Sequence, residues 1–152
     1  MTTTILILAA NPPETDRLNL ESEMRTIEEI RLKSRLRETF TVTLALAAQW
    51  DDLQYYLTTV QPKIIHYIGH GEGDQGLRMA REGGGVQAVT SDRLASLFKL
   101  FPYVDCVVLN ACHTEVQARA IHEHVSCVVG MSQSMEDEAA REFSAADRKS
   151  VV

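Results

Sequence analysis

The sequence predicts an α/β domain, a three-layer sandwich in which helices cover both faces of a mostly parallel central sheet. Short apolar runs alternate along the chain with segments in which apolar residues recur at helical spacing. This order is typical of βαβ units. The runs at 64–68 and 106–109 are almost wholly apolar, as strands buried on both faces of a parallel sheet are.

Five apolar runs predict the strands. They lie at residues 5–10, 40–47, 64–70, 106–112 and 127–131. The run at 40–47 alternates apolar and polar residues, which predicts a half-buried strand at an edge of the sheet. Residues 77–80 and 86–89 flank a glycine-rich segment and predict a small hairpin.

Helical spacing predicts the segments between the strands. Asn19 can cap the first helix, whose opening turn carries two glutamates where the helix dipole favours acids. Pro62 and Pro102 end the helices around 53–60 and 94–101. Residues 114–117 form a capping-box pattern that opens the next helix, and residues 136–143 predict a last one.

Composition excludes several classes of function. The net charge is −6, and no basic stripe of the kind that binds nucleic acid occurs. The densest basic segment, 31–37, fits a solvated helix end. No apolar run approaches the ~20 residues of a membrane span. The three cysteines form no disulfide framework, so we expect a cytoplasmic protein. From the net charge and the lack of a membrane span, we expect no nucleic-acid or membrane partner.

The two most informative residues are His70 and Cys112, each at the end of an apolar run. Ligands bind at the carboxyl ends of the strands in such sheets, so a candidate base and a candidate nucleophile meet at one edge. A helix beginning just after Cys112, together with His70, would favour the reactive thiolate. The N–H groups of Gly71 and Cys112 could form an oxyanion hole.

The other cysteines, a second histidine and a glycine-rich segment have simpler interpretations than a functional site. Cys106 and Cys127 open apolar strands and fit buried, inert thiols, while His66 lies within a strand and fits a core histidine. Residues 71–76 match a dinucleotide-binding glycine pattern, but a hairpin rather than a helix follows. We therefore expect no cofactor and no metal.

The segments around Gly69–His70–Gly71 and Asn110–Ala111–Cys112 resemble those of the caspase-like cysteine peptidases. The bacterial CHAT-domain family, the separase-related branch, is the more similar: residues 5–12, 61–71 and 107–131 follow its pattern. The resemblance implies a caspase-hemoglobinase fold and a His70–Cys112 dyad that cuts peptide bonds. It also implies a protein or peptide substrate and a regulatory or sensor partner.

The resemblance also suggests substrate-binding residues. In arginine-specific relatives an acidic residue tends to stand two positions before the nucleophile, where this chain has Asn110. We expect Asn110, Glu72 and His113 to line the substrate cleft. The main alternative is a non-catalytic signalling module that binds a partner on the same fold, and a third interpretation is a nucleotide-binding regulatory domain.

The end of the sequence departs from the family. We expect residues 1–143 to form the CHAT-like domain and residues 144–152 to be an irregular tail at a truncation point, so that the last strand of the sheet is missing. The strand at 127–131 would then be an exposed edge, prone to pairing with another chain, and the chain alone would have weak activity or none.

Overall fold

The computed structural model describes residues 2–10 and 20–132. The sheet strands are β1 (Thr3–Ala9), β2 (Phe40–Leu46), β3 (Ile64–Ile68), β7 (Cys106–Asn110) and β8 (Cys127–Val129). The helices are α1 (Leu20–Lys33), α2 (Trp50–Thr59), α3 (Ser91–Lys99) and α4 (Glu115–His122). The remaining elements are β4 (His70–Gly71), β5 (Leu77–Ala80), β6 (Val86–Val89) and the short 3₁₀ turns η1 (Arg37–Thr39) and η2 (Gly73–Gln75).

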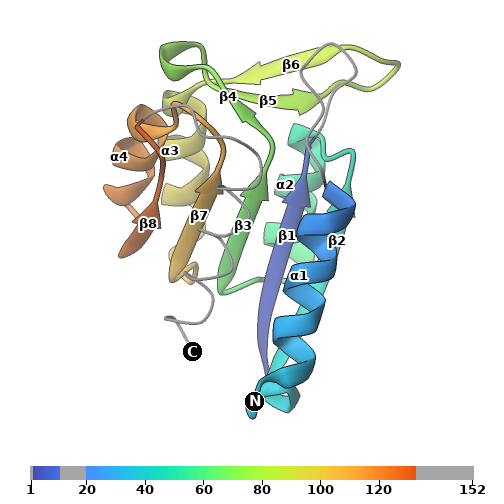
Figure 1. Cartoon of the computed structure of the whole chain (residues 1–152). Helices are drawn as coiled ribbons and strands as arrows, with labels where there is room; N and C mark the ends of the chain where they lie inside the picture. Colours follow the sequence, from blue (N-terminus) through green and yellow to red (C-terminus); the bar gives the residue numbers. More distant parts are fainter. Residues whose placement is uncertain (1, 11–19, 133–152) are drawn as a thin grey trace.

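The central sheet has the order β2-β1-β3-β7-β8, and all four neighbouring pairs are parallel. Figure 1 shows its strands pointing the same way, with the small β4-β5-β6 sheet across their carboxyl ends. The strand at 40–47 lies at an edge, as its alternation predicted. The parallel α/β architecture is confirmed.

Side chains of successive residues in β1 point to opposite faces of the sheet and pack in two separate clusters. Leu6 and Leu8 belong to the larger core, which includes apolar side chains of α2, α3 and α4. Ile7 packs with Ile27 of α1 in the smaller one. Figure 1 shows α1 in front of β1 and α2 behind the sheet, so the three layers follow from this alternation.

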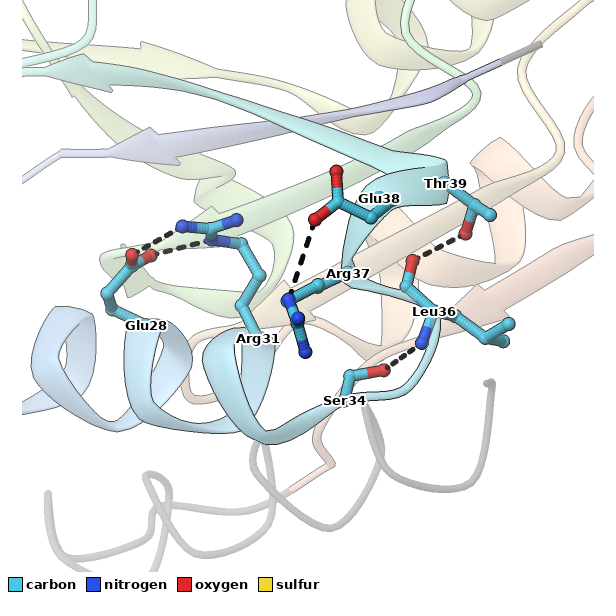
Figure 2. Close-up of polar contacts among 7 residues, drawn as sticks. All are labelled: Glu28, Arg31, Ser34, Leu36, Arg37, Glu38 and Thr39. Atoms are coloured by element: carbon cyan, nitrogen blue, oxygen red, sulfur yellow. Dashed lines mark hydrogen bonds and ion pairs between the residues drawn. The ribbon is translucent and has the colours of Figure 1, made fainter.

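The turn from α1 into β2 carries the densest basic segment of the chain (Figure 2). Arg31 makes two hydrogen bonds to the Glu28 carboxylate, at 2.6 and 2.9 Å, and these lower the pKa of Glu28. Arg37 Nε lies 3.5 Å from Glu38 Oε1. The Ser34 hydroxyl accepts a hydrogen bond from the backbone N–H two residues later, which helps to reverse the chain.

Three strands end two residues earlier than the sequence suggested, one of them β8, which ends at Val129. β3 ends at Ile68, and His70 begins the separate strand β4, which pairs with β5. Only glycine fits at the break, because a Cβ at position 69 would lie 2.5 Å from the Tyr67 hydroxyl and 2.6 Å from the Ala10 carbonyl. β7 ends at Asn110, so Cys112 stands in the turn that follows.

The capping box at 114–117 was a wrong prediction. Thr114 does precede α4, but its side chain makes no cap hydrogen bond. Its hydroxyl instead donates to the Ala111 carbonyl and accepts from Met131 N–H, both at 3.0 Å. The Asn19 cap, the helix at 136–143 and the tail at 144–152 lie outside the described residues.

None of the described helices is long and apolar enough to cross a membrane.

Candidate active site

The site forms where β3 and β7 end side by side. Their last register pair is Ile68 with Asn110, so His70 and Cys112 each follow two residues after it. Gly69 N–H donates to the Asn110 carbonyl at 3.3 Å, and Gly73 N–H donates to the His113 carbonyl at 3.0 Å. The segment that carries His70 therefore runs alongside the segment that carries Cys112.

Gly71 makes the closest contact between these two segments. A Cβ built on it would lie 2.4 Å from the Cys112 carbonyl oxygen and 2.6 Å from Thr114 Cγ2. Only glycine fits here, because any side chain would push the two backbones apart. The absence of a side chain at Gly71 therefore allows the segment with His70 to approach the segment with Cys112.

The direction of the Gly71 amide follows from the strand pairing. Glu72 N–H donates to the Gly76 carbonyl at 3.0 Å, and the next pair in register is Gly71 with Leu77. Hydrogen-bonded and non-hydrogen-bonded pairs alternate along an antiparallel ladder. The Gly71 N–H therefore points away from β5, toward the side on which Cys112 lies.

The hydroxyl group of Tyr67 holds the backbone of His70 in place. Its side chain is buried, and its hydroxyl lies 3.1 Å from the His70 carbonyl and 2.7 Å from the Arg78 carbonyl. Burial raises the pKa of Tyr67 well above its usual value, which keeps the hydroxyl protonated as a donor. The Nε2 atom of the His70 ring is buried and has no hydrogen-bond partner, so it is not committed to another protein group.

Cys112 is half-buried in the turn between β7 and α4. The next residue, His113, has a positive φ of 52°, a conformation that costs a non-glycine residue energy and often marks a functional site. The turn is held by Thr114, whose N–H donates to the Met131 carbonyl at 2.7 Å. The segment just after β8 therefore anchors the strained turn that carries the thiol.

Gln117 is a site residue that the sequence did not single out. It lies on α4 with no exposed surface, and its Nε2 donates to the Gly73 carbonyl at 2.6 Å. This bond joins the helix after Cys112 to the loop after His70. A glutamine on an amphipathic helix gives no sign of such a role, because only the fold reveals its acceptor.

The three expected cleft residues have different environments. Asn110 is 5% exposed, and its Oδ1 atom has no hydrogen-bond partner. Glu72 pairs with Arg78, which lowers the pKa of that carboxyl, and Arg78 also donates to Gln75 at 3.0 Å. His113 is exposed. The three residues are thus a buried amide, an ion-paired carboxylate and an exposed imidazole.

The other residues of the same types lie elsewhere. His66 is buried within β3, as predicted. Cys106 and Cys127 begin β7 and β8 at the amino ends of the strands. Cys106 is buried, but the prediction of a buried Cys127 was wrong, because that residue is exposed. Across the described ranges, no group of three or more His, Cys, Asp or Glu side chains could hold a metal ion. The glycine pattern at 71–76 contains the short 3₁₀ turn η2 and is followed by the strand β5, not by an α-helix.

No family model matches the chain. A Roc-COR-CHAT protease from an unknown prokaryotic organism is 22% identical over 144 residues, a match that covers 90% of this chain and 14% of that protein. The chain therefore spans only about a seventh of that relative's length.

Among solved structures, the chain is similar to a secreted C11 cysteine protease from Bacteroides thetaiotaomicron, crystallised with an irreversible peptide inhibitor. The TM-score is 0.63 at 11% identity, and the match covers 90% of this chain and 50% of that one. The described sheet and helices thus have the caspase-hemoglobinase fold, and the resemblance to CHAT-domain, caspase-like cysteine peptidases is confirmed.

Proposed function

We propose that the chain is a cysteine-type endopeptidase domain in which Cys112 is the nucleophile and His70 its general base. The observation that carries the proposal is the contact of their two segments. Gly71 lies against the Cys112 carbonyl, and hydrogen bonds on either side of this contact hold the segments together. Both similar proteins are named as proteases.

The chemistry needs one thiol and one imidazole. The Cys112 sulfur attacks the carbonyl carbon of the scissile bond, and His70 takes up the thiol proton. His70 then gives this proton to the leaving amine nitrogen as the C–N bond breaks, which leaves a thioester on Cys112. Water, deprotonated by His70, hydrolyses the thioester. The unpartnered Nε2 atom of His70 supports this role, because no protein group competes for the ring nitrogen.

The oxyanion that forms on the substrate requires hydrogen-bond donors. We assign this role to the N–H groups of Gly71 and Cys112. The Gly71 amide lies between the amides of Gly69 and Gly73, both of which already have carbonyl acceptors on the Cys112 side. Helix α4 begins three residues after Cys112, and its dipole also favours negative charge there.

The substrate cleft would be formed by Asn110, Glu72 and His113. Asn110 offers a buried amide with an unpartnered oxygen, a suitable base for the pocket that takes the side chain before the scissile bond. Since it carries no charge, we expect no strong preference for arginine or lysine at that position. Glu72, paired with Arg78, and the exposed His113 would form the rim.

A peptide-library cleavage assay tests the proposal. The 152-residue chain should cut a mixed library at defined positions, if only weakly, and Cys112→Ala should abolish the cutting while leaving the melting temperature unchanged within a few degrees. Cys127→Ser is the matched control, because it removes an exposed thiol remote from the site and should leave the cleavage pattern intact.

Two results would overturn the proposal. Cleavage that persists in Cys112→Ala would mean that another group or a contaminant does the chemistry. A folded chain that cuts nothing, and whose Cys112 reacts with a peptidyl chloromethyl ketone no faster than Cys127 does, would favour a non-catalytic binding module on the same fold.

A further inference from the structure

A pair of cysteine thiols lies at the amino ends of two strands, at the end of the sheet opposite the candidate active site. Cys106 begins β7 and Cys127 begins β8, and the two residues are register partners in the parallel sheet. Their sulfur atoms lie 3.0 Å apart, and they are not joined in a disulfide. Two thiols so close form a vicinal dithiol.

The positions of the two residues allow a covalent bond between them. Neighbouring strands lie about 4.8 Å apart, within the ~4.4–6.8 Å range of Cα separations that disulfides span. The contact between the two sulfurs shows that both side chains point to the same face. Cys127 is exposed while Cys106 is 7% exposed, so a solvent oxidant reaches the pair through Cys127.

The dithiol is separate from the nucleophile. Cys106 and Asn110 are the two ends of β7, and four steps of ~3.3 Å place them about 13 Å apart. Cys112 lies still further along the chain, in the turn after Asn110. A cross-link between Cys106 and Cys127 would therefore leave Cys112 chemically unchanged.

We propose that Cys106 and Cys127 are an oxidation site that hydrogen peroxide converts into an intramolecular disulfide. The Cys127 thiolate attacks one peroxide oxygen and becomes a sulfenic acid, and the first water leaves. The Cys106 thiolate then attacks the Cys127 sulfur and displaces the second water. Two thiols lose two electrons and two protons, and one peroxide becomes two waters.

The disulfide would stabilise the part of the fold that carries the nucleophile. It closes the chain from residue 106 to residue 127, a loop that contains Cys112 and all of α4. It also fastens β8, which is held to β7 by three register pairs only. The segment after β8 holds the turn at Thr114 through two hydrogen bonds with Met131. By fixing β8, the disulfide would make that turn more rigid.

The test uses the 152-residue chain carrying Cys112→Ala, so that the nucleophile does not consume oxidant. Treatment with hydrogen peroxide should lower the mass by ~2 Da, and peptide mapping should join the peptides that contain Cys106 and Cys127. The melting temperature should rise by about 5–10 °C, as a closed loop of this length predicts. Dithiothreitol should reverse both changes.

The control adds Cys127→Ser to the same chain, which should show neither the mass loss nor the thermal shift. The proposal is wrong if peroxide yields a sulfinic acid on Cys127 without a cross-link. It is also wrong if the disulfides that form join separate chains, or if the cross-link forms and the melting temperature does not rise.

Discussion

The substitution Gly71→Ala tests whether the contact of the two segments is essential. The added methyl group would lie 2.4 Å from the Cys112 carbonyl oxygen, and real Cβ atoms essentially never approach a heavy atom closer than 3.0 Å. The two segments must therefore separate by at least 0.6 Å (3.0 − 2.4). Overpacking of this kind costs about 1–3 kcal/mol of folding free energy.

The substitution should impair catalysis as well as stability. A shift on the order of 1 Å in a catalytic group costs ~100-fold in rate, and the required opening is somewhat smaller. We therefore expect kcat/KM for the best library peptide to fall by about 10–100-fold. The melting temperature should fall by about 2–10 °C. Steady-state peptide cleavage and differential scanning fluorimetry measure the two quantities.

Gly83→Ala is the matched control. Gly83 has a φ of 81° and no atom within 4 Å of the added methyl group, so the substitution costs about 1–2 kcal/mol of backbone strain in the turn between β5 and β6. It should lower stability and leave kcat/KM unchanged. If Gly71→Ala cleaves peptides as fast as the wild type does, the close contact is not a condition for activity and the reasoning fails.

Three further changes give expected outcomes. Tyr67→Phe removes the donor to the carbonyls of His70 and Arg78 and should cost about 1–2 kcal/mol in urea unfolding, with a fall in kcat rather than a rise in KM. Gln117→Leu removes the bond from α4 to the carbonyl of Gly73 in η2 and should also lower kcat, whereas loss of stability with full kcat would contradict a positioning role. Glu72→Gln should cost under ~1 kcal/mol, because the pair is partly exposed. The folded pKa of Glu72 lies below its unfolded value near 4.5, so the small contribution is present above that pH and is lost as the pH falls through the folded pKa, which unfolding curves at pH 3 and 7 would show.

The sequence predicted the sheet well because its strands are apolar and its helices are amphipathic. All five predicted sheet strands occur, and the hairpin at 77–80 and 86–89 matches β5 and β6. The sequence also indicated that His70 and Cys112 lie at the same end of the sheet, since the carboxyl ends of parallel strands meet there. That their strands are neighbours is a finding of the structure. These features depend on local pattern and simple topology alone.

The contacts that position the site could not be predicted. Position 69 requires glycine because of the Tyr67 hydroxyl and the Ala10 carbonyl. The Thr114 hydroxyl bonds to the backbone of Ala111 and Met131 instead of capping α4. Gln117 contacts a carbonyl 44 positions away. Each is a tertiary contact between segments distant in sequence, and local propensity carries no information about such partners.

The rate of Cys112 alkylation by iodoacetamide tests the central claim most directly, because it needs no knowledge of the substrate. Cys112 is less exposed than Cys127, so exposure alone predicts that Cys112 reacts more slowly. Pairing with His70 should reverse this order, so that Cys112 reacts at least ~10-fold faster than Cys127 at pH 7. His70→Ala should remove this advantage, and His122→Ala, at the exposed end of α4, should not. Equal rates at Cys112 and Cys127, or a Cys112 rate that does not change in His70→Ala, would contradict the pairing of His70 with Cys112.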